Sequence, residues 1–270
     1  MSDTIKDTLQ LRYRRLGTSL AALSYLFLLA PLFVVVPIAF GTGSDMSFPP
    51  KDYSLDLFRI FFSSPDWTGP LLQSAKVSII TMIVTLLTGV PAAYGIARYD
   101  FPGKKLISAL MMSSLVVPTI VTALGLYLYF SVLRINGSTF ALVLGHVIYT
   151  TPYVLVMILA GIQKLDRNLE FGAELMGARP ARMFVTVVLP QLVPSLVAAS
   201  LFAFLISFDE VVIAWFLSGS DTVTLPVKMF SSIRWEISPV IAAVSTLLTT
   251  MSLVVSLIVA SMRKTTPAAG

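Results

Sequence analysis

Long apolar runs, separated by short polar segments, dominate this 270-residue chain. A helix needs about 20 apolar residues to cross the hydrocarbon core of a bilayer, and several runs exceed this length. Hydrophobic residues make up 56% of the chain and charged residues only 12%, against about 25% charged residues in soluble domains. A transmembrane β-barrel would instead show alternating segments of about ten residues. The sequence therefore predicts an all-α, polytopic membrane protein.

The apolar runs predict six spanning helices, at residues 17–41, 72–97, 106–132, 140–163, 191–218 and 239–262. We expect them to form a single transmembrane domain over residues 17–262, with short tails at 1–16 and 263–270. The first run is longer than the apolar region of a signal peptide, about 7–15 residues, so it is expected to stay as an uncleaved helix. Residues 55–62 could form a short interfacial helix, and residues 219–238 are expected to form a loop.

Lysine and arginine are distributed unevenly over the polar segments. The basic residues before the first span are Lys6, Arg12, Arg14 and Arg15. Cytoplasmic segments of membrane proteins carry an excess of Lys and Arg. With the N-terminal tail inside, basic residues on that side outnumber the others by about two to one. We therefore expect both termini, and the polar segment 164–190, on the cytoplasmic side of the membrane.

The residue types that carry most enzyme and metal chemistry are scarce here. The chain has no cysteine and one histidine, His146, so a metal site built from several such ligands is not expected. The phosphate loop G-x-x-x-x-G-K-[ST] is missing from the sequence. We expect no cofactor in this chain, no nucleic-acid partner and no enzymatic activity of its own.

The segment 164–190 is a long polar insertion between two spans. Four apolar residues recur within it at helical spacing, namely Leu165, Leu169, Ala173 and Met176. The charged residues lie largely on the other faces of the helix. Gly177 suits a helix end, because glycine takes left-handed backbone angles without a Cβ clash. Pro180 is favourable in the first turn of a second helix. The segment therefore predicts a helix, a glycine turn, a second helix and a return to the membrane at Pro190.

The same segment resembles the cytoplasmic coupling motif of binding-protein-dependent ABC transporter permeases, which reads roughly E-A-A, three residues, Gly, nine residues, I-x-L-P. Gly172 and Ala173 stand at its two Ala positions, and Gly177 stands at its Gly. Its closing positions hold Val187, Leu189 and Pro190. The leading Glu of the motif falls on Phe171, a departure, with Glu170 one place earlier.

This resemblance implies that the segment docks on a separate ATPase. The residues that it implicates in coupling are Glu170, Gly172, Ala173, Glu174, Gly177, Ala178, Leu189 and Pro190. Small residues at the turn would permit close approach, and the helix ends would transmit a push. From the chemistry of the residues alone, a surface helix that only links two spans is the alternative.

The resemblance covers roughly residues 90–262, and its later part looks like the spermidine/putrescine-type permeases. The segments that carry this likeness are Ser207-Phe208-Asp209-Glu210-Val211-Val212-Ile213 and Thr224-Leu225-Pro226-Val227-Lys228. The family implies a type I ABC importer fold, surrounded by lipid in the bacterial inner membrane. It also implies an ABC ATPase dimer that holds ATP and Mg, a second and often different permease chain, a periplasmic binding protein, and alternating access.

Two carboxylates interrupt the apolar run that follows Pro190. Ionisable residues at membrane depth usually face a cavity or a pathway. Asp209 lies 19 residues after Pro190, which is about 28 Å of helix at ~1.5 Å per residue and corresponds to the outer half of the membrane. Asp209 and its neighbour Glu210 point about 100° apart on a helix, so we expect one of them to face the path of a cationic amine.

Aromatic residues near the helix ends could contribute to the same path. The rings of Tyr149 and Trp215 could hold an ammonium group. Tyrosine and tryptophan also serve as anchors at the membrane interface, so both interpretations stay open for these two residues.

Other functions account for less of the sequence. An importer of another small solute, such as an amino-acid derivative or an opine, would share the coupling segment. An ion-coupled secondary transporter would use Asp209 and Glu210 as proton carriers, but such proteins often contain inverted repeats, and no repeat is visible. A membrane enzyme needs a nucleophile with a base, or a metal cluster. The main prediction is thus a permease subunit of an ATP-driven importer for a small, cationic nitrogenous solute.

Overall fold

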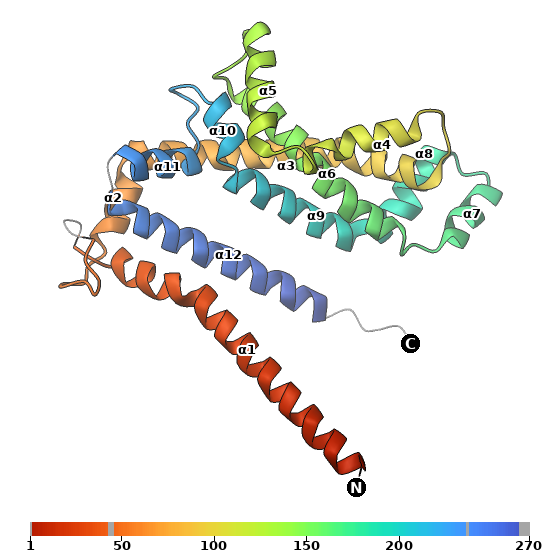
Figure 1. Cartoon of the computed structure of the whole chain (residues 1–270). Helices are drawn as coiled ribbons and strands as arrows, with labels where there is room; N and C mark the ends of the chain where they lie inside the picture. The colour runs from red at the N-terminus through yellow and green to blue at the C-terminus, as the bar shows by residue number, and fades with distance from the viewer. Residues whose placement is uncertain (1, 43–45, 236–237, 265–270) are drawn as a thin grey trace. The chain divides into compact units, whose positions relative to one another are not determined.

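A computed structural model describes residues 2–42, 46–235 and 238–264 of the chain (Figure 1). The named elements in these ranges are all helices, which confirms the predicted all-α fold. In chain order they are α1 (Ser2–Ala39), α2 (Asp56–Ser63), α3 (Pro65–Arg98), α4 (Lys104–Met112), the 3-10 turn η1 (Ser113–Leu115), α5 (Thr119–Val132), α6 (Thr139–Ile162), α7 (Arg167–Leu175), α8 (Pro180–Met183), the π-helical turn η2 (Phe184–Val188), α9 (Leu189–Asp209), α10 (Val212–Leu217), α11 (Leu225–Trp235) and α12 (Val240–Lys264).

The helices form two compact units. In one unit α12 packs against α1 and α2, and Leu57 and Phe61 are the buried residues of α2. This short helix confirms the one expected at residues 55–62. The other unit runs from Asp66 to Arg234 and contains the residues discussed below. The prediction of one membrane domain over residues 17–262 stays a prediction.

Within the described residues, four helices are long and apolar enough to cross a bilayer: Gly17–Ala39, Pro65–Arg98, Thr139–Ile162 and Pro180–Asp209. The number of candidate spans rises to five if the bent pair of helices Lys104–Leu115 and Thr119–Val132 is counted as one span. In α12 the stretch Val240–Val254 is apolar as well. All six predicted spans are thus helical, but two of them are interrupted, and the predicted loop at 219–238 is partly helical.

The predicted continuous span 106–132 is wrong. The chain turns by 107° between α4–η1 and α5, at Pro118. Proline has no N–H to donate to the preceding turn, and it disfavours helical angles in the residue before it, here Val117. The segment therefore contains two helices that meet at a sharp bend.

The predicted span 191–218 is also wrong in its limits. Its helix begins earlier, because α8, η2 and α9 form one helical run from Pro180 to Asp209. Pro190 lacks an N–H, and the widened π-helical turn ends two residues before it, at Val188. The helix ends at Asp209, and α10 starts at Val212 after a break at Glu210.

The segment 219–238 was predicted to be a loop, but α11 occupies Leu225–Trp235. Pro226 lies in the first turn of α11, where a missing N–H costs nothing. Pro226 was therefore the available sequence signal for a helix start in this segment.

The core of the larger unit lies where α6 meets α9. Gly161 lets the two helices approach, because a Cβ there would collide with the side chain of Ser195; small residues are common at such crossings in membranes. The ring of His146 lies in the same interface, with Nδ1 2.8 Å from Ser207 Oγ. These contacts fix α9 against α6, and the two ends of α9 carry the predicted functional residues.

Candidate functional site

The first predicted coupling helix exists as α7, and its two ends are capped by its own sequence. Asp166 is the N-cap, and its side chain accepts a hydrogen bond from Asn168 N at 2.9 Å. At the other end Gly177 adopts φ +82°, the left-handed angle expected for it. Gly177 N donates to Glu174 O at 2.9 Å and Ala178 N donates to Ala173 O at 3.0 Å, which is the Schellman arrangement. The predicted helix stop at Gly177 is confirmed.

Most of the apolar face of α7 points away from the rest of its unit. Leu169 is 52% exposed and Met176 is 90% exposed. Phe171, at the departure from the family motif, is 61% exposed. Only Ala173 of the apolar stripe, together with Leu165 before the helix, packs against the core. Most of the apolar side chains of this face are thus left uncovered by the chain.

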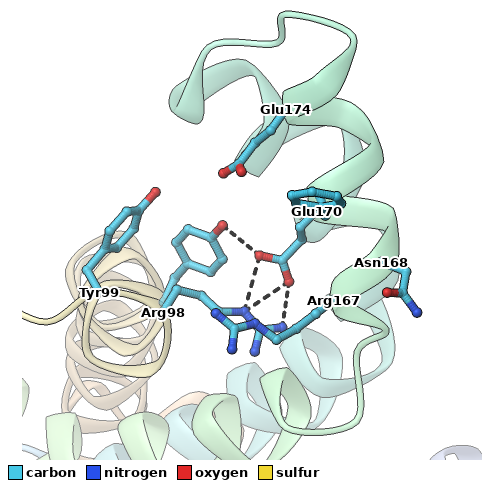
Figure 2. A pocket seen from close by; sticks show the side chains of 8 residues that line it. Arg98, Tyr99, Arg167, Asn168, Glu170 and Glu174 are labelled. Carbon is cyan, nitrogen blue, oxygen red and sulfur yellow. Dashed lines mark hydrogen bonds and ion pairs between the residues drawn. The ribbon is translucent and has the colours of Figure 1, made fainter.

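Glu170 is turned the opposite way, into the protein. It is the one buried residue of α7, a helix that the structure describes in full. Arg98 at the end of α3 donates through Nε to both carboxylate oxygens, at 2.9 and 3.1 Å, and through Nη2 to Oε1 at 2.5 Å. The Tyr94 hydroxyl donates to Oε2 at 2.9 Å. Figure 2 shows the Glu170 carboxylate facing the Arg98 guanidinium across the gap between the two helices.

The cluster has further links on the α3 side. Arg98 Nη2 also lies 3.4 Å from Ile162 O, the last residue of α6. The ring of Tyr94 packs against Phe184 of η2, with 4.9 Å between centroids. The side chains of Arg98 and Glu170 are only 11% and 10% exposed. Removing one partner of such a buried pair typically costs about 3–5 kcal/mol, because the other charge is left without compensation.

A pocket of about 280 Å³ opens beside this pair. It is lined by Tyr94, Arg98, Tyr99, Arg167, Asn168, Glu170, Phe171 and Glu174. Tyr99 and Arg167 lie on its two sides in Figure 2, and Glu174 lies one turn further along α7. The predicted coupling residues Glu170 and Glu174 therefore have different environments, one buried and paired and the other exposed.

The remaining predicted coupling residues follow in one excursion of the chain. Gly172 and Ala178 are half-buried, and Gly177 is exposed at the turn. Leu189 packs against the core of the larger unit, and Pro190 is exposed in the first turn of α9. In Figure 1, α7 and α8 lie at the end of α9 opposite to α10. The excursion therefore leads from α6 directly into the next candidate span.

The predicted path residues lie at that opposite end. Asp209 ends α9 and is exposed, whereas Glu210 is 8% exposed. The Glu210 carboxylate accepts a hydrogen bond from Ile213 N at 2.6 Å and so caps α10. The exposed carboxylate of the pair is therefore Asp209.

Trp215 belongs to a neighbouring groove. Its ring meets Phe230 edge-on, with centroids 5.1 Å apart, and the guanidinium of Arg234 lies 5.3 Å from the Phe230 ring. The groove has a volume of about 260 Å³ and an apolar lining. Tyr149 instead packs against Tyr153, at 5.8 Å. The structure thus places Tyr149 beside Tyr153 and Trp215 in a separate groove.

Sequence reasoning missed two residues that contact the predicted coupling helix, Tyr94 and Arg98. Arg98 was counted only as a basic residue that reports topology. The two residues are four apart, which places them on one face of α3, and this was the available signal. Their partner Glu170 is 72 residues beyond Arg98, a separation that a helical pattern does not bridge.

Comparisons with known proteins place this architecture. Residues 85–265 match the family described as binding-protein-dependent transport system inner membrane component. The chain is 30% identical over 244 residues to the putrescine transport system permease protein PotI of Escherichia coli (strain K12), covering 84% of this chain and 83% of that protein. It is 27% identical over 230 residues to the spermidine/putrescine transport system permease protein PotC of Haemophilus influenzae, covering 85% and 89%.

A solved structure supports the fold. The chain superposes on a chain of a bacterial ABC transporter involved in the import of the acidic polysaccharide alginate, with a TM-score of 0.75 at 13% identity, over 92% of this chain and 95% of that one. The fold is therefore that of a permease of this type. Because the family match extends over more than half of the sequence, the chain belongs to the inner membrane components of binding-protein-dependent transport systems.

Proposed function

We propose that this permease is the membrane subunit of an ATP-driven importer for a small cationic amine, and that residues 164–190 form the segment that binds its ATPase. The observation that carries the proposal is the exposed apolar face of α7, held between a capped start and the Gly177 turn in front of a spanning helix. A helix that buries a carboxylate and exposes its apolar side chains suits a groove on another protein.

The ATPase is a separate dimer that holds ATP and Mg. Its grooves receive α7 from this chain and the equivalent helix from a second permease, which is often a related but different chain in this family. The positive-inside bias puts both termini and α7 on the cytoplasmic side. On the other side a periplasmic binding protein delivers the solute. ATP binding draws the coupling segments together and opens the path outward, and hydrolysis resets it.

The solute is proposed from two supports. Relatives at 30% and 27% identity are named as permeases for putrescine and for spermidine/putrescine. In this chain, Asp209 presents an exposed carboxylate at the end of α9. A carboxylate that borders a water-filled path attracts cations. The binding protein sets the selectivity among amines in this family, and we propose for this chain a class of solute, the small polyamines.

The test is uptake by the reconstituted complex. The chain, its ATPase, the second permease and the binding protein are placed in liposomes, and entry of radiolabelled putrescine is measured with and without ATP. ATP-dependent uptake that needs the binding protein is the expected result. Uptake that survives without ATP but fails without an ion gradient would overturn the proposal. ATP-dependent uptake of an amino-acid derivative or an opine, with none of putrescine, would overturn the choice of solute alone.

A further inference from the structure

We propose that Arg98 is a positioning residue that passes the movement of α7 on to α3 and α6. The proposal rests on the function given above, in which residues 164–190 receive the ATPase. It goes beyond that function, because it assigns the step by which a push on α7 reaches the spanning helices to one side-chain cluster, Arg98 with Glu170 and Tyr94.

The first observation is how α7 is attached. Of its residues, all of which the structure describes, Glu170 alone is buried. The apolar residues Phe171, Leu175 and Met176 are 61%, 74% and 90% exposed. Apolar packing of these side chains therefore does not hold α7 against the spanning helices. Beside the small contact of Ala173 with the core, α7 is attached across this interface by the hydrogen bonds to the Glu170 carboxylate.

The second observation is the geometry of the attachment. Arg98 reaches Glu170 through both Nε and Nη2, a bidentate arrangement that fixes orientation as well as distance. Nη2 also reaches the Ile162 carbonyl at 3.4 Å, at the end of α6. One guanidinium thus joins α3, on which it lies, to α6 and α7.

The third observation concerns the two connections of α7 within the chain. On one side the segment 163–166 joins it to α6, and on the other side Gly177 turns the chain toward α8. A helix of nine residues between two short turns can tilt about its ends unless a side chain holds it. With the Arg98–Glu170 pair in place, a tilt of α7 moves the end of α3. Without the pair, α7 moves alone.

Two cysteines would report this movement directly. The chain has no native cysteine, so spin labels on Met176→Cys and Leu87→Cys would be specific. These positions are 90% and 71% exposed, at the C-cap of α7 and on α3. In the assembled complex we expect the distance between them to stay constant, with a narrow distribution, when ATP is trapped on the ATPase. In Arg98→Lys, which keeps the charge and loses the planar fork, we expect the distance to change and its distribution to broaden on ATP trapping.

Transport is the second readout. Arg98→Lys is expected to keep the ATPase bound and ATP hydrolysis near wild type, whereas Glu170→Gln, which leaves the Arg98 charge without its partner, tests the pair from the α7 side. Putrescine uptake per ATP hydrolysed should fall about tenfold, within the usual range of coupling between sites. Tyr94→Phe removes one hydroxyl and should give a smaller loss in the same direction. The matched control is Asp100→Asn, which breaks the exposed Lys104–Asp100 pair two residues after Arg98 and should behave as wild type.

Each outcome decides the matter. An unchanged distance distribution in Arg98→Lys, or uptake per ATP within about twofold of wild type, would overturn the proposal. So would loss of the ATPase from both variants, because the pair would then only shape the docking surface. If Glu170→Gln does not assemble, Arg98→Lys and Tyr94→Phe decide. Absence of an ATPase from the wild-type complex would instead refute the proposed function. The distance between the two spin labels is measured without putrescine, so it tests the Arg98–Glu170 contact even if the complex carries another solute.

Discussion

Two buried glutamates lie near opposite ends of α9 in the larger unit, and they differ in what they bind. Glu170 and Glu210 have the same exposed fraction, 8%. Glu170 binds side chains 72 and 76 residues away on another helix, whereas Glu210 binds a backbone N–H three residues further along the chain. A long-range bond ties two helices together, while a local bond ends one helix and begins the next. The same residue type thus links two helices at one end and caps a single helix at the other.

The largest effect is expected from Arg98→Ala, which removes the long-range partner. Glu170 would be left buried without its cation, at a cost of about 3–5 kcal/mol. We expect fast hydrogen exchange throughout α7 and loss of uptake. Hydrogen exchange read by mass spectrometry on the assembled complex would test this. Lys104→Ala is the control, because its exposed pair with Asp100 is worth about 0–1 kcal/mol. If α7 exchanged as slowly as in wild type, Arg98 would not be what holds it.

A valine at Gly177 should have the next largest effect. Gly177 and Gly103 have φ +82° and +84°, and a Cβ at either would meet nothing within 4 Å. The backbone cost of Gly→Val is therefore similar at both, about 1–2 kcal/mol. Only Gly177 joins α7 to α8, so uptake and ATPase binding should fall for Gly177→Val and not for Gly103→Val. Equal losses in the two variants, measured by uptake and by co-purified ATPase, would mean that strain alone is responsible.

A smaller effect is expected from Glu210→Ala, because a local cap is lost. Such losses cost about 0.5–2 kcal/mol and are confined to the helix concerned. We expect faster hydrogen exchange in α10, unchanged exchange in α7, and a modest fall in thermal stability of the purified complex. A loss as large as that of Arg98→Ala would show that Glu210 also has a long-range partner, and the contrast between the two glutamates would fail.

The contrast also explains which features the sequence could predict. The apolar runs and Gly177 are local signals: length and the absence of a Cβ suffice to place a helix or its end. The bend at Pro118 was within reach, because proline and the residue before it resist helical angles. It was missed because the apolar run continues through it, and a hydropathy pattern does not register a change of direction.

A periodic pattern in the sequence does not predict which residues from distant helices contact one another. Leu169 and Met176 have the spacing of a packed stripe, but periodicity does not say whether the stripe packs on the same chain or on another one. Here it faces outward, and a glutamate faces inward. Likewise, the 100° between neighbours implied that Asp209 and Glu210 diverge, but not which one is exposed. That choice depends on the break before α10, where the backbone N–H of Ile213 needs an acceptor.

The smallest effect on stability, and the sharpest test of the far end of α9, is expected from Asp209→Asn. Asp209 is exposed, so the change should not alter folding by more than about 0.5 kcal/mol. If its charge attracts the amine, the loss is about 1 kcal/mol for a contact near 4 Å in water, or about a fivefold fall in putrescine uptake at low solute. Raising the ionic strength should narrow the difference between variant and wild type, because salt screens exposed charges. Glu210→Gln keeps an acceptor for Ile213 and should change uptake less. If Glu210→Gln lowered uptake more than Asp209→Asn, the buried carboxylate would be the one that meets the solute, and the capping role would not be its only one.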